Sequence, residues 1–146
     1  MFLLFITVEQ QSTTFKYIFP VLEAFISKPY SVLKSANVDG TKELLRISCK
    51  GIPKVFNHMS SISVFSSISL QVSERDSIDG QSTPYTAEGY SKSKWVAEKL
   101  VDIARSRGLT ANIFRLGMVS WHTETGHYNE LDWFNRLVSG VITLGK

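Results

Sequence analysis

The sequence predicts an α/β domain built on a parallel sheet, and three consecutive segments carry that prediction. An apolar run from about Lys54 to Ser60 has the two-sided apolar character typical of a strand buried in a parallel sheet. A helical pattern follows from Glu88 to Arg107, and TANIFRLG then forms a second short apolar run. A strand, a helix and a strand with a short return after Gly108 indicate a βαβ unit, which crosses over right-handed in nearly all parallel sheets.

An N-terminal segment and a helix precede this unit. Residues 1–28 are atypical, because MFLLFITV is compatible with a strand and Pro20 interrupts any helix in the run that follows. Residues 29–146 are predicted to form a single domain. Within them, residues 31–48 place their apolar side chains on one helical stripe, although Gly40 weakens its middle. Gly51 and Pro53 end this helix before the first strand.

A long loop and two helices complete the predicted elements. Residues 66–85 are polar and are predicted to form a loop, whose length favours a functional role. The helix 88–107 ends at Gly108, and its expected apolar side consists of Trp95, Val96, Leu100, Val101, Ile103 and Ala104. A last helix is predicted from Asp132 to Ser139.

Composition narrows the possible functions. The 146 residues suit one domain, and 43% apolar with 20% charged residues is typical of a globular protein. The net charge of +3 comes from dispersed lysines and arginines, so no basic run argues for nucleic-acid binding. The lone Cys49 excludes a disulfide framework, suits a reducing cytoplasm and is expected to be a small buried side chain. No apolar run reaches the roughly 18 residues of a membrane span, and no positive residue precedes MFLLFITV as in a secretory signal.

Three residue types that suit carbonyl reduction occur around the predicted loop. Ser60 and Ser61 end the first strand, where ligands bind in parallel sheets, and Tyr90 and Lys94 lie one turn apart on the next helix. An ammonium near a phenol is expected to lower the phenol's pKa towards neutral pH. Such a phenol can give a proton to a carbonyl oxygen while a hydride reaches the carbon, and a serine hydroxyl can stabilise the same oxygen.

A second tyrosine–lysine pair with the same spacing has a different setting. Tyr30 follows Pro29 at a helix start, and no serine-bearing strand end precedes it. We therefore expect Tyr30 and Lys34 to be structural. The remaining polar candidates are also expected to be structural: His58 as a packed core residue, and His122 and His127 with no ligand spacing that predicts a metal site.

Five segments in a fixed order carry a resemblance to a known family. They are PYSVLKSANVDGTKELLRIS, KVFNHMSSISVF, GYSKSKWVAEKLV, FRLGMVS and TGHYNELDWFNRLVSGVITLG, and they span roughly Pro29 to Gly145. With them the chain resembles the extended short-chain dehydrogenase/reductase superfamily. Within it, the chain is most similar to the thioester reductase domains of nonribosomal peptide synthetases and carboxylic acid reductases. The resemblance implies a Rossmann-type sheet and NADPH-dependent reduction of an acyl thioester, held on an acyl or peptidyl carrier protein, to an aldehyde or alcohol.

The resemblance also implies roles for individual residues. Ser61 would bind the carbonyl, Tyr90 would donate the proton, and Lys94 would hold the nicotinamide ribose while lowering the tyrosine's pKa. Leu116, Gly117 and Met118 match the segment that passes the nicotinamide carboxamide, although Leu116 stands where the family often has proline. Asn37 matches an asparagine that organises the neighbouring helix, and a purely structural role is at least as plausible for it. Ser60 would support the strand end.

One part of the family pattern is missing from the sequence. The first glycine is Gly40, so the N-terminal glycine-rich βαβ unit that receives the cofactor pyrophosphate does not occur before it. We therefore expect an internal fragment of a larger reductase that binds NADPH poorly by itself. The alternatives are a fragment of a fatty acyl-CoA reductase, or a non-catalytic remnant that binds a partner through an exposed sheet edge.

Overall fold

The computed structural model describes residues 28–65, 72–79, 89–118, 120–130 and 132–145, together with three two-residue strands nearer the N-terminus. These strands are β1 (Leu4–Phe5), β2 (Tyr17–Ile18) and β3 (Pro20–Val21). The chain divides into two compact units, Met1–Leu116 and Gly117–Lys146, and each is described by itself. None of the helices within the described ranges is both long and apolar enough to cross a membrane.

The first unit contains the predicted parallel sheet. Its strands β4 (Val55–Ser61) and β5 (Ala111–Leu116) pair in parallel from Phe56 opposite Ala111 to Ser61 opposite Leu116. On the other side of β4, β2 pairs with it in parallel, and the sheet order is β2-β4-β5. β1 and β3 form a separate antiparallel pair. The α/β class and the parallel sheet predicted from the sequence are confirmed.

The helix predicted over residues 31–48 is one helical run in three parts. It consists of α1 (Tyr30–Leu33), a π-helical stretch at Lys34–Asp39 and α2 (Gly40–Ser48). Gly40 does not break the helix. The irregular part is the π-helical stretch just before the glycine, and the helix continues through both. Cys49 caps the end of α2 and is exposed, so its predicted burial is wrong.

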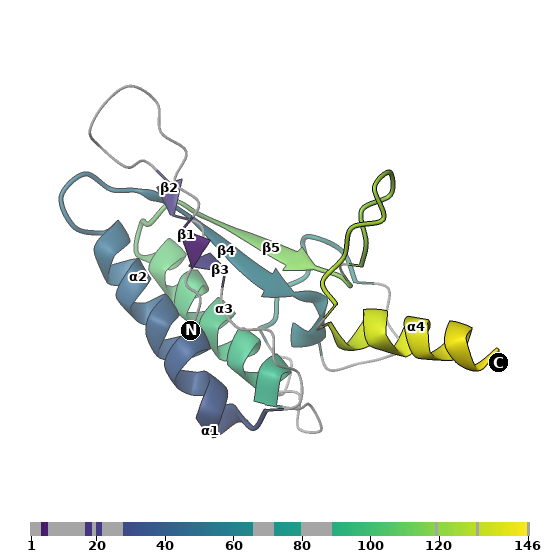
Figure 1. Ribbon diagram of the computed structural model, residues 1–146. Helices are drawn as coiled ribbons and strands as arrows, with labels where there is room; N and C mark the ends of the chain where they lie inside the picture. Colours follow the sequence, from purple (N-terminus) through teal and green to yellow (C-terminus); the bar gives the residue numbers. More distant parts are fainter. Residues whose placement is uncertain are drawn as a thin grey trace. The chain divides into compact units, whose positions relative to one another are not determined.

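The long helix α3 (Gly89–Ser106) covers one face of the sheet beside α1 and α2 (Figure 1). Val101 packs with Phe56 and Leu44 in the core, and Leu100 and Ala104 pack against that cluster. Ile103, predicted on the apolar side, is instead largely exposed. α3 ends at Ser106, and the predicted stop residue Gly108 follows with a φ of 97°, a conformation that residues with a Cβ rarely adopt.

Close backbone packing explains the glycine at the start of α3. A Cβ on Gly89 would lie 2.2 Å from the Tyr30 nitrogen and 2.4 Å from the Lys28 carbonyl oxygen. Only glycine therefore allows the start of α3 to approach the start of α1 this closely.

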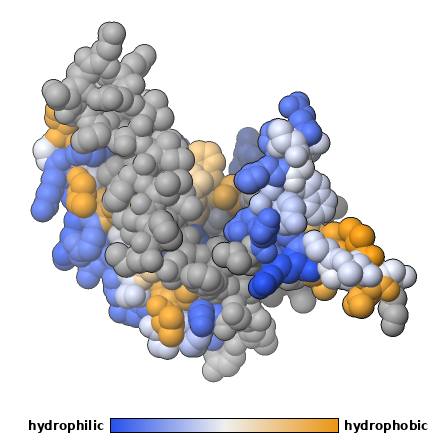
Figure 2. All heavy atoms as spheres, in the orientation of Figure 1, coloured by the Kyte–Doolittle hydropathy of each residue, from blue (hydrophilic) through white to orange (hydrophobic). Residues whose placement is uncertain are grey.

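The second unit contains a turn and the helix α4 (Trp133–Leu144). Asp132 caps α4 by accepting from the Phe134 and Asn135 nitrogens at 3.0 and 3.4 Å, which agrees with the predicted start. The helix runs five residues past the predicted end, because Gly140 is tolerated inside it and the left-handed Gly145 ends it. Leu137, Val141, Ile142 and Leu144 leave much of α4's surface apolar (Figure 2).

Candidate active site

The site begins at the carboxyl end of β4, where Ser61 leaves the strand. Ser61 has extended backbone and caps the 3-10 turn Ile62–Val64. Its hydroxyl accepts from the Ser63 backbone nitrogen at 3.2 Å and from the Ser63 hydroxyl at 3.0 Å. These bonds hold a half-buried serine hydroxyl at the strand end, which is the position expected from the sequence.

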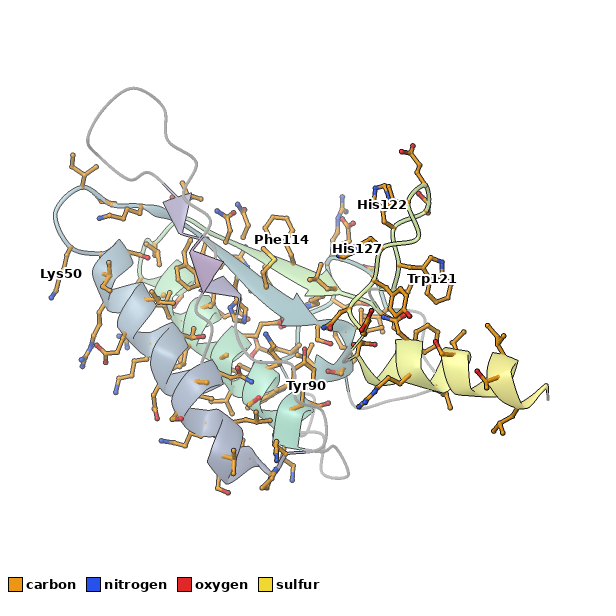
Figure 3. All side chains as sticks on the ribbon, viewed as in Figure 1. Lys50, Tyr90, Phe114, Trp121, His122 and His127 are labelled. Carbon is orange, nitrogen blue, oxygen red and sulfur yellow. The ribbon has the colours of Figure 1, made fainter. Side chains whose placement is uncertain are left out.

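Tyr90 and Lys94 lie on the first turns of α3, and Tyr90 is near the end of β4 (Figure 3). The buried Lys94 ammonium donates to the Met59 carbonyl oxygen of β4 at 2.9 Å. It lies 5.8 Å from the centre of the half-buried Tyr90 ring. The Ser61 side chain is close enough to Tyr90 to lower its pKa. The structure therefore brings Ser61, Tyr90 and Lys94 together.

The electrostatic balance at Tyr90 differs from the sequence-based expectation. Burial raises the pKa of Tyr90 above its ordinary value, and the neighbouring Ser61 side chain lowers it by a smaller amount. The Lys94 ammonium donates instead to a backbone carbonyl. The expected lowering of the Tyr90 pKa is therefore not found, and the phenol is protonated at neutral pH.

Burial also changes Lys94 itself. It lowers the pKa of Lys94 to about 8, because removing an ammonium from water disfavours its charged form. One of the three N–H groups of Lys94 donates a hydrogen bond to the Met59 carbonyl oxygen. Within the described part of the chain its other two N–H groups form no hydrogen bond, and Lys94 lies one helical turn from the protonated phenol.

The helix beside the site is fastened to α3 through Asn37. Its side-chain nitrogen donates to the Ser93 hydroxyl at 2.9 Å, and Ser93 in turn donates to the Tyr90 carbonyl oxygen at 2.7 Å. Asn37 is fully buried and lies in the π-helical stretch, a distortion that is frequent at functional sites. Asn37 therefore supports the turn that carries Tyr90, and Ser93 is a link that sequence reasoning missed.

The three residues matched to the nicotinamide segment are divided between the two units. Leu116 ends β5 directly opposite Ser61 in the strand register and is exposed. Gly117 and Met118 follow it as exposed residues at the start of the second unit. Leu116 is thus the one of these three that the structure places beside the serine.

The second tyrosine–lysine pair has a surface environment. Lys34 forms an ion pair with Asp39 at 3.2 Å, and both side chains are about half exposed. This agrees with its interpretation as a structural pair.

A buried charged residue that sequence reasoning missed adjoins the site. Glu98 accepts from the Ser60 hydroxyl at 2.5 Å and from the Arg115 guanidinium at 2.6 and 3.0 Å. Ser60 thus supports the strand end, as the resemblance implied. A signal was present in the sequence, because Tyr90, Lys94 and Glu98 follow one another at intervals of four residues on one helix face.

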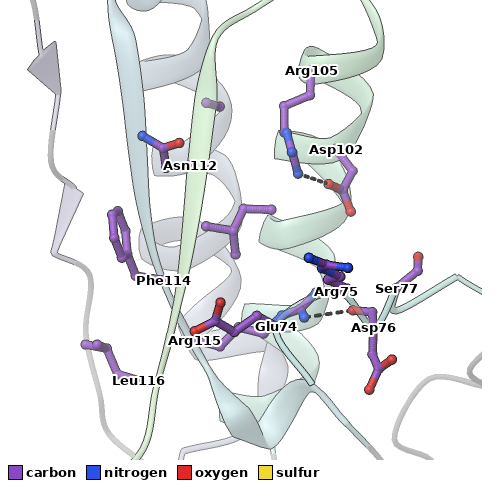
Figure 4. Close-up of a pocket in the computed structure, with 12 residues that line it drawn as sticks. Glu74, Arg75, Asp76, Ser77, Asp102, Arg105, Asn112, Phe114, Arg115 and Leu116 are labelled. Carbon is purple, nitrogen blue, oxygen red and sulfur yellow. Dashed lines mark hydrogen bonds and ion pairs between the residues drawn. The ribbon is translucent and has the colours of Figure 1, made fainter. Parts of the chain in front are cut away.

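A groove of about 1060 Å³ lies along the outer edge of β5 (Figure 4). Residues 74–77 of the long loop, Asp102 and Arg105 of α3, and β5 itself line it. Leu116 is among its lining residues, whereas Ser61, Tyr90 and Lys94 are not, so the groove does not contain the three catalytic candidates.

The histidines of the second unit lie in a tight turn. The His122 nitrogen donates to the His127 carbonyl oxygen at 2.8 Å, and the His122 ring accepts from the Thr125 nitrogen at 3.2 Å. Across the residues that the structure describes, no three His, Cys, Asp or Glu side chains gather to hold a metal ion.

Known proteins resemble this chain over most of its length. A component of the linear gramicidin synthase of Brevibacillus parabrevis is 38% identical over 122 residues, which are 81% of this chain and 2% of the synthase component. The crystal structure of the terminal R domain from the myxalamid PKS-NRPS biosynthetic pathway is similar with a TM-score of 0.79 and 35% identity, covering 86% of this chain. A thiolation-reductase di-domain from an archaeal nonribosomal peptide synthetase shares the fold, with a TM-score of 0.69 and 19% identity over 92% of this chain.

These likenesses cover only part of each relative. The chain spans 32% of the myxalamid R-domain chain and 37% of the archaeal di-domain chain. The thioester-reductase resemblance drawn from the five sequence segments is confirmed. Residues 24–146 match a family of NAD-binding domains described as Male sterility protein, and the chain belongs to that family.

Proposed function

We propose that this chain is part of a reductase domain that uses NADPH to convert a carrier-bound acyl thioester into an aldehyde or alcohol. The observation that carries the proposal is the meeting of Ser61, Tyr90 and Lys94 at the carboxyl end of β4. In parallel α/β sheets this edge is where ligands bind. The proposed reductase portion is residues 29–146, and residues 1–28 are an atypical N-terminal segment whose strand β2 pairs with β4.

The proposed mechanism uses each side chain at a defined atom. The bound nicotinamide supplies the hydride that adds to the thioester carbonyl carbon. The Tyr90 hydroxyl gives its proton to the carbonyl oxygen, and the raised pKa of Tyr90 supports this role because it keeps the phenol protonated. The Ser61 hydroxyl donates a hydrogen bond to the same oxygen and stabilises its developing charge. Release of the carrier thiol then leaves the aldehyde, and a second reduction would give the alcohol.

Lys94 and the end of β5 would hold the nicotinamide end of the cofactor. The Lys94 ammonium donates to the Met59 carbonyl oxygen and has two further N–H groups for ribose oxygens. Leu116, Gly117 and Met118 would pass the carboxamide. The phosphates would need a glycine-rich turn, and the first glycine of this sequence is Gly40. We therefore expect the 146 residues alone to bind NADPH weakly, and micromolar binding by calorimetry would contradict this.

A carrier protein is the proposed partner. The archaeal relative is a thiolation-reductase di-domain, in which a thiolation domain accompanies the reductase. The gramicidin relative is a component of a peptide synthase. These relatives support a carrier-bound thioester over a free acyl-CoA, and a comparison of the two substrates tests that choice.

A chimera tests the catalytic assignment. Residues 29–146 would replace the matching part of the myxalamid R domain, with which the chain is 35% identical. NADPH oxidation would be followed with a carrier-bound thioester and with the same acyl group on CoA. Tyr90→Phe should reduce turnover by about 10²–10⁴-fold, as expected for loss of a general acid, and leave NADPH affinity nearly unchanged.

Tyr30→Phe is the matched control, because it removes a phenol of the same spacing from the surface pair. It should retain turnover. Retained turnover in Tyr90→Phe would remove Tyr90 from the mechanism. A folded chimera that binds NADPH but reduces neither substrate would favour the non-catalytic remnant.

A further inference from the structure

Glu98 is a fully buried carboxylate on the helix face that carries Tyr90 and Lys94. Intervals of four residues place Tyr90, Lys94 and Glu98 on successive turns. Each of the three approaches the end of β4: Tyr90 lies beside Ser61, Lys94 donates to the Met59 carbonyl oxygen, and Glu98 accepts from Ser60. One face of α3 therefore contacts three consecutive residues, 59 to 61, at the end of β4.

The Glu98 carboxylate also joins the two strands. Ser60 and Arg115 are direct partners in the register of β4 and β5, and Glu98 bonds both. One of its oxygens takes the Ser60 hydroxyl at 2.5 Å, and the other takes the Arg115 Nε and terminal nitrogen at 3.0 and 2.6 Å. The next partners in the register are Ser61 and Leu116. Glu98 thus clamps the pair immediately before the candidate serine.

Arg115 extends this clamp to the long loop. Its remaining terminal nitrogen donates to the Asp76 carbonyl oxygen at 2.8 Å (Figure 4). Its guanidinium lies 4.7 Å from the centre of the Phe65 ring. The loop is held further by the buried Ile78 and by the ion pair of Asp79 with Lys99. The strand ends, α3 and residues 72–79 are therefore tied together through one buried charge pair.

We propose that Glu98 is a positioning residue for the candidate active site, which sets the place of Ser61 relative to Tyr90 through Ser60 and Arg115. This inference rests on the proposed function. Productive sites require side chains held within about 0.5 Å, and buried charge-assisted hydrogen bonds are short and directional enough to supply this. The carboxylate touches neither Ser61 nor Tyr90 in the bonds described above, so it acts through the backbone of the two strand ends.

Nuclear magnetic resonance on the complete 146-residue chain tests the proposal without cofactor or turnover. The probe is the ¹³Cζ resonance of Tyr90 at neutral pH, which is sensitive to the Ser61 hydroxyl beside the phenol. Ser61→Ala gives the signature of losing that hydroxyl. Glu98→Ala should move the Tyr90 resonance in the same direction by at least half as much, and it should also move the Ser61 and Leu116 amide resonances. Glu43→Gln, which alters an exposed carboxylate paired with Arg46, should leave all three unchanged.

The outcomes separate positioning from mere stabilisation. A folded Glu98→Ala chain with the wild-type Tyr90 resonance would overturn the proposal, even if it unfolds more easily. If Glu98→Ala does not fold, the isosteric Glu98→Gln is measured instead, and an unchanged Tyr90 resonance there overturns the proposal equally. Since no step needs turnover, an inactive chimera would refute the proposed function and leave this result standing, whereas an active chimera with an unmoved resonance would refute only the positioning role.

Discussion

His58 makes the stability of the fold depend on pH. It lies in the middle of β4, is fully buried and stacks on Phe56 with ring centres 6.3 Å apart. Neither ring nitrogen has a hydrogen-bond partner within the described part of the chain. Burial, and then the nearby Lys94 charge, lowers the pKa of His58 from 6.5 to about 3. The His58 imidazole is therefore neutral in the folded protein at pH values where it is protonated in the unfolded chain.

The sign and size of the effect follow from this difference. Between pH 6.5 and about 3 the unfolded chain binds a proton that the folded chain does not, so the free energy of unfolding falls as pH falls. The stability contribution is fully present above pH 6.5. It declines by about 2 kcal/mol between pH 7 and pH 5, and by on the order of 5 kcal/mol once pH reaches the folded pKa.

Urea unfolding of the wild type and of His58→Leu at several pH values from 7 to 5 measures this contribution. We expect His58→Leu to lose the decline of about 2 kcal/mol and to be at least as stable as the wild type at pH 7, because leucine buries no unpaired nitrogen. His127→Gln alters an exposed histidine, retains His58 and should keep the wild-type decline. Equal pH dependence in the wild type and His58→Leu would refute the assignment of the effect to His58.

Two further predictions concern the charge pair and the glycine contact. Arg115→Met should lower the free energy of unfolding by about 3–5 kcal/mol, because it leaves the buried Glu98 unpaired. The control Arg46→Met removes an exposed pair and should lower it by only about 0–1 kcal/mol. Equal losses in urea unfolding would contradict this prediction. Gly89→Ala should cost about 1–3 kcal/mol or more through its clash with the Tyr30 backbone. Gly140→Ala meets no atom within 4 Å and should stabilise α4 by about 0.5–1 kcal/mol, so thermal melts should shift in opposite directions.

Local patterns predicted the helices and strands of the first unit closely. The predicted strand from Lys54 to Ser60 is Val55–Ser61, and the predicted helix from Glu88 to Arg107 is Gly89–Ser106. Periodicity and the glycine at 108 are local properties of the chain, so they could be recognised without the fold. The π-helical stretch could not be predicted, because it accompanies the contact between Asn37 and Ser93, 56 residues apart.

The proximity of three candidate residues could be predicted from the sequence, but their electrostatics could not. Residue type, spacing and the family resemblance singled out Ser61, Tyr90 and Lys94, and the structure brings them together. The direction of the Tyr90 pKa was wrong, because it depends on the water that packing removes and on the partner that Lys94 contacts. The predicted burial of Cys49 and Ile103 was also wrong, because both are exposed. Burial depends on which segments pack against a helix, and the sequence of the helix does not specify them.

The α/β class, the order of the elements and the resemblance to thioester reductases could be predicted because they depend on residue patterns along the chain. The bonds of Glu98 with Ser60 and Arg115, and the protonated state of Tyr90, emerged from the folded structure. Both depend on distances and burial between segments far apart in the chain. Such distances set the energy of interaction between charged groups, and burial sets the cost of desolvating them. Spacing along the chain encodes neither quantity.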